Sequence, residues 1–298
     1  MPASGSLTLS VVMASDGAMD RIPDRLAALA RACRGIAAEV VLVVPSGVEP
    51  TAVVDPPLKV RTVGASSGLV PVQWGHGILA ASGPIVALTT SQFRVTDDWA
   101  YALLRVFETT ETVAVGGRIA LAPGTGYLGR AAHLVRYSEH MSETLDGAPR
   151  DPAGENAAYR RGAVLSACPD LREGFWEVDV HRVIRSDGGI VSFDPAVVAE
   201  FAPVVSLRGM LRNRFLHGGH FGTHRVEVLG WNRWLALAVT PLVPFLLLMR
   251  ILRRAARAGH RPWSVLTVVP AVLTLLVAWA AGEAHGAFRS GSPVRHAD

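Results

Sequence analysis

The fold that this sequence predicts is decided by two short apolar stretches, LTLSVVMAS (7–15) and EVVLVVPSG (39–47). Each stretch is rich in β-branched residues and ends at a polar or turn-forming step, which is typical of a strand buried on both faces. Between them, residues 23–34 place apolar side chains at helical spacing, and Gly35 ends that helix. Buried strands that alternate with amphipathic helices predict a parallel, doubly wound sheet.

The same alternation continues along the chain. We expect strands at 58–64, 84–90 and 113–121, with helices at 71–83 and 99–109 between them. Beyond them, the pattern predicts a Gly- and Pro-rich substrate-side loop at 123–154 containing a helix at 129–142, helical blocks at 156–168 and 174–189, a strand pair or edge strand at 190–201, and a basic helical segment at 209–225.

The composition narrows the class of protein. The chain has 298 residues, of which 50% are hydrophobic, and its formal net charge is +4, with Lys59 as its single lysine. A basic chain that is rich in arginine suits anionic membranes and phosphate-bearing substrates. No aromatic-basic stacking surface or helix-turn-helix pattern indicates nucleic acid as a partner. The two cysteines, Cys33 and Cys168, lack metal-ligand spacing and are typical of a reduced, cytosolic domain.

Two charge-free apolar runs, 235–249 and 263–281, lie near the carboxyl end. As helices they would measure about 22 Å and about 28 Å, against a bilayer core of about 30 Å. Tryptophans flank both runs, as at membrane interfaces, and three prolines would kink them. A buried helical hairpin of a soluble core is the alternative. We expect the runs to associate with a membrane, because such long charge-free runs are rare in soluble helices.

Arginines flank the apolar runs on both sides. The connector 250–261 is strongly basic and favours the cytoplasmic side, but the outer flanks are basic too. Two full spans would place arginines on both sides of the membrane. A shallow or re-entrant insertion keeps every arginine at one headgroup layer, so we slightly favour it over two full spans. The expected organisation is an α/β domain at 1–205 on the cytoplasmic face of the cell membrane, a basic amphipathic connector at 206–230, and a membrane-associated helical hairpin and tail at 231–298.

Six blocks of this sequence occur in an order shared with a known family: LSVVMAS (9–15), GPIVALTTSQFRVTDDW (83–99), ENAAYRRGAV (155–164), GFWEVDVHRVIRSDG (174–188), RFLHGGHFGTHR (214–225) and WAAGEAHGAFRSG (279–291). Together they resemble the family 2 glycosyltransferases, in the subfamily that ends in hydrophobic helices. The resemblance covers nearly the whole chain. It implies a GT-A-like fold, in which helices flank a mixed, mainly parallel sheet and membrane-associated helices follow. It also implies transfer of a sugar, with inversion, from a nucleotide donor to a lipid-linked or amphiphilic acceptor.

The resemblance places the catalytic base in the block 174–188, where the family carries an acidic pair. Glu177 aligns with the first member of that pair, Val178 takes the place of the second, and Asp179 is the reserve. On a helix Glu177 and Asp179 point away from each other, so only one can face the site. The alternative is that both are solvated helix carboxylates. Trp176 could stack on a sugar ring, although a core position is the safer interpretation. His181, one turn after Glu177, could orient it or could be a surface residue.

The donor site departs from the family pattern. The metal-binding DxD falls on Thr90, Ser91 and Gln92, and the aspartate that usually ends the second strand is Pro45. Neutral hydroxyl and amide groups are poor ligands for a hard divalent cation, so we expect no Mg²⁺ or Mn²⁺ at the usual position and no other cofactor. Asp16, at the end of the first strand, remains for a ribose or base contact, or serves as a helix cap. Thr90, Ser91 and Gln92 are retained as donor-binding residues.

Without a metal, the leaving phosphate needs arginines or helix N-termini. Candidates of this kind are Arg160, Arg161, Arg214 and Arg225, and the resemblance adds Asn156 on the acceptor side. His217, His220 and His224 have a spacing that invites a zinc site. However, two glycines weaken that helix and no Cys or carboxylate lies alongside, so a role for His220 towards phosphates or headgroups is favoured.

Three functions fit these observations. The first is an active, metal-independent glycosyltransferase with membrane lipids, an activated donor and an amphiphilic acceptor as partners. The second is a catalytically degenerate GT-A domain that serves as a scaffold subunit. The third keeps the fold but uses a donor other than a nucleotide diphosphate sugar. Retention of Glu177, Asn156 and the basic segment favours the first, and loss of acid at positions 45, 90 and 92 favours the other two.

Overall fold

The computed structural model describes residues 7–16, 19–48, 58–145, 151–227 and 230–290. The predicted tail beyond residue 290 lies outside this part of the chain. The described residues form two compact units. One is an α/β unit of residues 1–123 and 140–203, and the other is a helical unit of residues 124–139 and 204–298.

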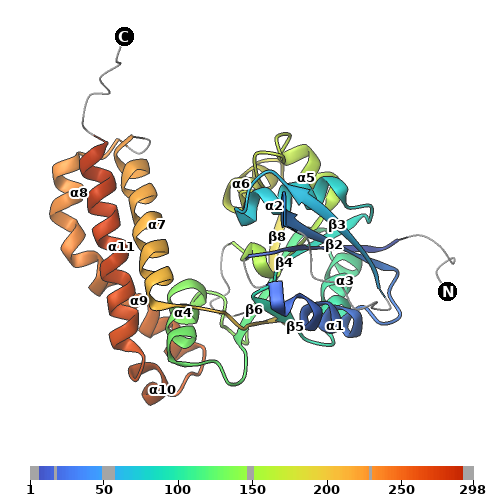
Figure 1. Cartoon of the computed structure of the whole chain (residues 1–298), viewed down its shortest axis with the longest axis horizontal. Helices are drawn as coiled ribbons and strands as arrows, with labels where there is room; N and C mark the ends of the chain where they lie inside the picture. The colour runs from blue at the N-terminus through green and yellow to red at the C-terminus, as the bar shows by residue number, and fades with distance from the viewer. Residues whose placement is uncertain (1–6, 17–18, 49–57, 146–150, 228–229, 291–298) are drawn as a thin grey trace, which may run out of the picture. The chain divides into compact units, whose positions relative to one another are not determined.

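The α/β unit is built on one eight-stranded sheet, in the order β3-β2-β1-β4-β7-β6-β8-β5 (Figure 1). Strands β3, β2, β1 and β4 are mutually parallel, whereas β7 is antiparallel to both of its neighbours. The sheet is therefore mixed and mostly parallel, as predicted. The strands span Leu9–Ala14 (β1), Ala38–Pro45 (β2), Lys59–Ala65 (β3), Ile85–Thr90 (β4), Phe93–Val95 (β5), Thr112–Leu121 (β6), Ala157–Arg160 (β7) and Ile190–Phe201 (β8).

Helices cover both faces of the sheet because alternate side chains of the central strands point to opposite sides. Val11 and Met13 of β1 pack with α1 and α3, whereas Val12 and Ala14 pack with α2, α5 and α6. Figure 1 shows these two layers on opposite sides of the sheet. The helices span Met19–Arg21 (η1), Ile22–Ala32 (α1), Val70–Ala80 (α2), Trp99–Thr109 (α3), Gly154–Asn156 (η2), Arg161–Ala167 (α5) and Glu177–Ser186 (α6).

Two sequence predictions for this unit were wrong. The block 156–168 was expected to be helical, but it begins as the buried strand β7, which inserts between β4 and β6. A short alanine-rich run is compatible with a helix as well as with a strand, and here hydrogen bonding to β4 and β6 makes it a strand. The stretch 190–201 is a single strand between β6 and β5 rather than a pair or an edge.

The helical unit contains the carboxyl-terminal part of the chain together with α4, which is the helix predicted at 129–142 within the loop at 123–154. Both predicted apolar runs are broken near their prolines: a 3₁₀ turn holds Pro241, and Pro270 lies in the first turn of α11. The elements span Tyr127–Tyr137 (α4), Leu207–Glu227 (α7), Arg233–Val239 (α8), Thr240–Leu242 (η3), Val243–Arg257 (α9), Pro262–Leu266 (α10) and Val269–Arg289 (α11).

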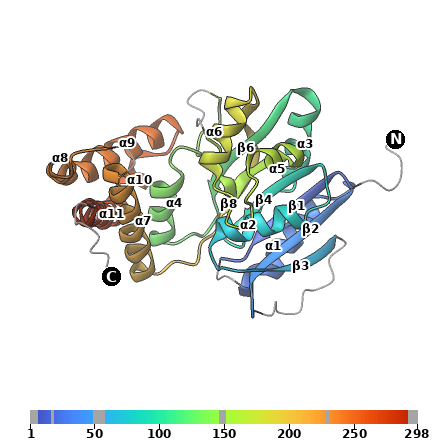
Figure 2. The same ribbon diagram turned by 90° about the horizontal axis from the view of Figure 1, so that it is seen from above.

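Helix α7 packs along α11, as Figure 2 shows in a view nearly down α11. Glycines at the contact bring the two backbones together. A Cβ atom added at Gly218 would lie 1.9 Å from the carbonyl oxygen of Trp279, and one added at Gly282 would lie 1.9 Å from that of Phe215. Small residues four apart on both helices allow this close approach. The predicted basic connector is therefore one half of a tightly packed helix pair.

Two helical stretches, Arg233–Arg257 and Val269–Arg289, are long and apolar enough to cross a membrane by length and composition. They differ in how far the protein covers them. Of the most apolar window, 18% is buried in the first stretch and 50% in the second. The first stretch thus leaves most of its apolar surface open, which weakly indicates membrane association.

Candidate active site

The carboxyl ends of β1 and β4 meet at one edge of the sheet, because these neighbouring strands are parallel with Ala14 opposite Thr90. Asp16 follows β1 and accepts hydrogen bonds from the Thr90 hydroxyl (3.0 Å) and the Ser91 hydroxyl. The Asp16 amide in turn donates to Ser91 Oγ, at 3.2 Å. Open α/β sheets bind ligands at this edge. The structure thus brings together Asp16, Thr90 and Ser91, with Gln92 next in the chain.

Two residues that the sequence reasoning missed hold this edge in place. Both come from the first turns of α2. The Gln73 side chain bonds both backbone groups of Ser15, accepting from its N–H and donating to its carbonyl, each at 2.8 Å. The Trp74 indole donates to the Thr89 carbonyl at 3.0 Å. The sequence signal that could have identified Gln73 is a polar residue within a mainly apolar helical block, and the structure shows that its side chain is fully buried.

The start of α6 lies at the same edge. The Phe175 amide donates to the Pro71 carbonyl at 2.8 Å, which ties this segment to the first turn of α2. Trp176 is 51% exposed, so the expectation of a core position was wrong, and its indole is open to a ligand. Glu177 opens α6 and is half-buried.

The carboxyl group of Glu177 has a raised pKa. Burial raises it most, the nearby Glu155 and Asp151 carboxyls raise it further, and a backbone N–H bond opposes them, for a pKa of about 7. A carboxylate with this pKa is both basic enough to accept a proton and ionised enough to act near neutral pH. Glu177 is therefore suited to general base chemistry.

His181 lies one turn later and is fully buried. Its Nε2 lies 2.9 Å from the Tyr159 hydroxyl and its Nδ1 lies 3.2 Å from Asp151 Oδ1. Arg185 also donates to Asp151, at 2.7 Å. Burial lowers the pKa of His181 to about 4, so the ring is neutral and Nδ1 carries the proton towards the carboxylate. His181 contacts Tyr159 and Asp151 rather than Glu177, so neither the orienting role nor the surface position expected for it is found.

Two other predicted residues, Asp179 and Asn156, are engaged elsewhere. Asp179 is exposed and forms an ion pair with Arg182, at 2.7 Å. Asn156 is fully buried, where it accepts from the Trp99 indole at 2.8 Å and donates to two carbonyls. The Asn156 amide is thus committed to the packing of η2, which corrects its expected role on the acceptor side.

Arg160 stands at the opposite edge of the sheet. It pairs with Ile85, the first residue of β4, whereas Thr90 is the last. Its guanidinium donates to the carbonyls of Thr112 and Phe107, each at 3.0 Å. Arg161 likewise donates to carbonyls at the end of α2. Neither arginine joins the group around Asp16, so the expectation that Arg160 contacts the leaving phosphate was wrong.

The remaining predicted residues belong to α7 in the helical unit. Arg225 forms an ion pair with the buried Glu283 of α11, at 2.6 Å. Arg214 is half-buried, and burial together with the nearby Arg136 lowers its pKa to about 10. His220 is exposed. Their roles towards phosphate stay predictions.

Comparison of the backbone with solved structures establishes the fold. A mannosyltransferase from Pyrobaculum calidifontis, solved in complex with GDP-Man and Mn²⁺, matches 96% of this chain and 88% of its own, with a TM-score of 0.52 and 18% identity. The fold is GT-A-like. A mycobacterial protein matches 71% of this chain and 73% of its own, with a TM-score of 0.48 and 14% identity. Compared by sequence, the chain matches no protein-family profile and no curated protein.

The edge around Asp16 offers few of the ligands that a divalent cation needs. The side chains at the DxD position are two hydroxyls and one amide, and both hydroxyls point at the carboxylate of Asp16. Hard cations need several oxygen ligands, with carboxylates among them. Within the described ranges, no group of three or more His, Cys, Asp or Glu side chains could hold a metal ion. The residues at this edge therefore do not fit a divalent cation.

Proposed function

We propose that this protein is an inverting glycosyltransferase that uses a nucleotide sugar and has Glu177 as its general base. The observation that supports this most is the position of Glu177. A carboxyl group with a pKa of about 7 opens α6 beside the exposed Trp176, at the sheet edge where GT-A-like folds bind their donor.

The reaction needs one proton transfer and one displacement. Glu177 accepts the proton of the acceptor hydroxyl while the oxygen attacks the anomeric carbon of the donor sugar. The bond from that carbon to the diphosphate breaks, and the nucleoside diphosphate leaves with the electron pair. Trp176 offers an aromatic face to a sugar ring. A base in this position contributes about 10²- to 10⁴-fold to the rate.

The donor is proposed to bind along Asp16, Thr90, Ser91 and Gln92 without a metal ion. The Thr90 and Ser91 hydroxyls, which donate to Asp16 in this structure, could turn to donate to diphosphate oxygens instead. GDP-Man is the first donor to test, because the mannosyltransferase with this fold was solved with it. In the part of the chain that the structure describes, no cluster of three or more His, Cys, Asp or Glu side chains could hold a metal ion such as Mn²⁺.

The acceptor is proposed to be lipid-linked or amphiphilic. The support for this is the open apolar surface of Arg233–Arg257, which would hold the enzyme at a membrane with its α/β unit in the cytoplasm. The proposed organisation keeps an α/β domain at 1–205, a basic segment at 206–230 and a membrane-associated hairpin from 231 onwards.

A catalytically degenerate scaffold, or a transferase with another kind of donor, is the competing function. The observation that favours both is the absence of acidic side chains at Pro45, Thr90 and Gln92.

Thermal shift of the detergent-purified chain against GDP-, UDP- and TDP-sugars, with EDTA and with Mn²⁺, separates these functions. We expect one nucleotide sugar to stabilise the protein equally in EDTA and in Mn²⁺. Stabilisation only with Mn²⁺ would overturn the metal-free donor site, and no stabilisation would favour the competing functions.

Substitution then tests the base. We expect Glu177→Gln to lower kcat by about 10²- to 10⁴-fold while leaving donor affinity unchanged, because only proton transfer is lost. Asp179→Asn is the matched control, since this carboxylate is exposed and paired with Arg182 on the same helix. Full activity of the Glu177→Gln enzyme would show that Glu177 is not the general base.

A further inference from the structure

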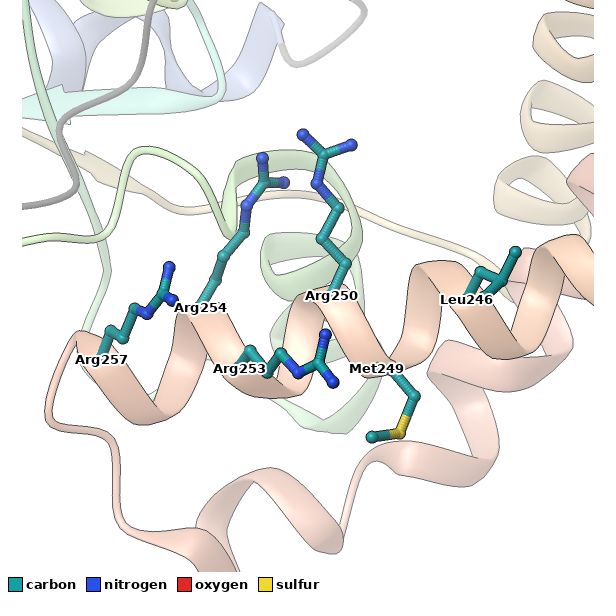
Figure 3. Close-up of a pocket in the computed structure, with 6 residues that line it drawn as sticks. All are labelled: Leu246, Met249, Arg250, Arg253, Arg254 and Arg257. Atoms are coloured by element: carbon teal, nitrogen blue, oxygen red, sulfur yellow. The ribbon is translucent and has the colours of Figure 1, made fainter.

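Four arginines line a concave surface on α9. This surface, called here the arginine face, has a volume of about 540 Å³ and consists of Leu246, Met249, Arg250, Arg253, Arg254 and Arg257. Figure 3 shows Arg250, Arg254 and Arg257 extending from the same side of the helix. Two apolar side chains lie at one end of this surface and the guanidinium groups occupy the rest.

The positive charge of the arginine face is largely uncompensated. Arg254 forms an ion pair with Glu139, which lies two residues after the end of α4, at 2.8 Å. Among the residues that the structure describes, no carboxylate pairs with Arg250, Arg253 or Arg257. Guanidinium groups bind phosphate oxygens in a planar, two-pronged geometry. Three such groups without acidic partners, next to one another on a helix, are complementary to several phosphates.

An apolar stripe continues the arginine face towards the start of α9. Leu242, Phe245, Leu246 and Met249 are exposed and follow one another at helical spacing, so they share a side of the helix. From Leu242 to Met249 the stripe is about 10 Å long at 1.5 Å per residue. Exposed apolar side chains on one side of a helix are what interfacial helices bury, to a depth of about 5–10 Å, in the acyl boundary of a bilayer.

The second apolar helix, α11, packs against α7, which carries charged and polar side chains. Helix α7 packs along α11 through its glycines and carries Arg212, His220 and His224 on exposed positions. It also forms the ion pair between Arg225 and the buried Glu283 of α11. If α11 crossed a bilayer, α7 would carry these charges and histidines into the hydrocarbon, which is strongly unfavourable. This pairing favours insertion of an apolar surface over a full span.

We propose that the arginine face sits on the headgroup phosphates of an anionic bilayer, with the apolar stripe of α9 inserted into the acyl boundary. Arg250, Arg253 and Arg257 bind lipid phosphates, while Leu242, Phe245 and Leu246 enter the hydrocarbon. The partner is therefore a lipid surface that carries negative charge, and the attachment is interfacial. This inference does not depend on the proposed reaction, because it concerns only where the helical unit binds.

The test uses the full-length protein and vesicles of two compositions, phosphatidylcholine alone and three parts phosphatidylcholine to one part phosphatidylglycerol. The variant Arg250→Gln/Arg253→Gln/Arg257→Gln keeps the apolar stripe and the Arg254–Glu139 pair. Its matched control, Arg34→Gln/Arg172→Gln/Arg182→Gln, removes the same charge from exposed positions of the α/β unit. Helical content by circular dichroism confirms that both variants are folded, and co-flotation measures binding.

We expect the wild-type protein to prefer the anionic vesicles. The arginine-face variant should bind them about 100-fold more weakly, at about fivefold per arginine, and should lose the salt dependence of binding. The control variant should bind within about twofold of the wild type.

Three results would overturn the proposal. Equal weakening in both variants would mean that only net charge matters. Resistance of membrane-bound protein to alkaline carbonate in both variants would show a full span. Displacement from anionic vesicles by inorganic phosphate at constant ionic strength would show a site for a discrete phosphate instead of a lipid surface.

Discussion

At the scale of single residues, the chemistry of the candidate site depends on the surroundings of one carboxyl group. Glu177 is half-buried among other acidic side chains, and each of these conditions disfavours its charged form. Asp179, two residues later, is exposed and paired with an arginine. Two carboxylates on one helix thus have different environments, which is how one becomes suited to proton transfer and the other to solvation.

This difference predicts a specific pH dependence. If Glu177 is the base, kcat/KM should rise with pH and level off above about 7, because the group must be ionised. Replacing Glu155 by Gln removes a neighbouring negative charge and so lowers the pKa of Glu177. We therefore expect the acidic limb of the pH–rate profile of Glu155→Gln to move to lower pH.

The same profile for Asp179→Asn is the control and should match the wild type. An acidic limb that stays in place, or moves to higher pH, in Glu155→Gln would show that Glu177 does not determine it.

At the scale of elements, the helical unit depends on the close contact of α7 and α11. The contact is made by backbone atoms, because glycines on each helix face the carbonyl groups of the other. Such contacts gain van der Waals energy over a long interface but tolerate no added methyl group. The free energy of unfolding lost on replacing a glycine by alanine should therefore differ sharply between neighbouring glycines of α7.

Gly222 and Gly219 provide the comparison. A Cβ atom at Gly222 would lie 2.1 Å from the Glu283 carbonyl oxygen, whereas one at Gly219 would lie 3.7 Å from that of Gly282. We expect Gly222→Ala to lower the free energy of unfolding of the helical unit by about 1–3 kcal/mol. Gly219→Ala should be neutral or stabilising by up to about 1 kcal/mol, because alanine favours helices.

Thermal unfolding followed by circular dichroism in a mild detergent measures both effects. Equal stability of the two variants would mean that α7 and α11 are not packed as described.

At the scale of the whole molecule, the chain has two units with separate interiors. The described core of the α/β unit forms two clusters, one on each face of the sheet, and both consist of residues of that unit. Units with their own cores can unfold separately. We expect calorimetry of the full chain to show two transitions, of which a bound nucleotide sugar raises only the one that belongs to the α/β unit.

Single substitutions in each unit show which of the two thermal transitions belongs to that unit. His181→Leu leaves the buried Tyr159 hydroxyl without a partner and removes one of the two groups that bond Asp151, at a cost of about 1–3 kcal/mol, and should lower the transition of the α/β unit. Gly222→Ala should lower the other one. A single transition that both variants lower equally would show that the two units unfold as one.

Much of the fold follows from local sequence patterns. The strands β1, β2 and β4 and the helix α6 were predicted close to their observed positions, because runs of β-branched residues and helical spacing are local signals. The sequence placed Asp16 at the end of the first strand and Thr90 and Ser91 at the end of the fourth, but only the structure shows that both hydroxyls meet the Asp16 carboxylate. The GT-A-like fold, which the resemblance of six sequence blocks implied, is confirmed by the comparison with solved structures.

The sequence by itself determined these elements and their chemical character, and tertiary structure decided which residues come together. Tyr159 lies in an inserted antiparallel strand, His181 meets Asp151 instead of Glu177, and Arg160 lies at the far edge of the sheet. The glycines of α7 meet α11 about sixty residues later in the chain. Contacts of this kind depend on pairing and packing between distant segments, and no local pattern in a single sequence encodes the partner.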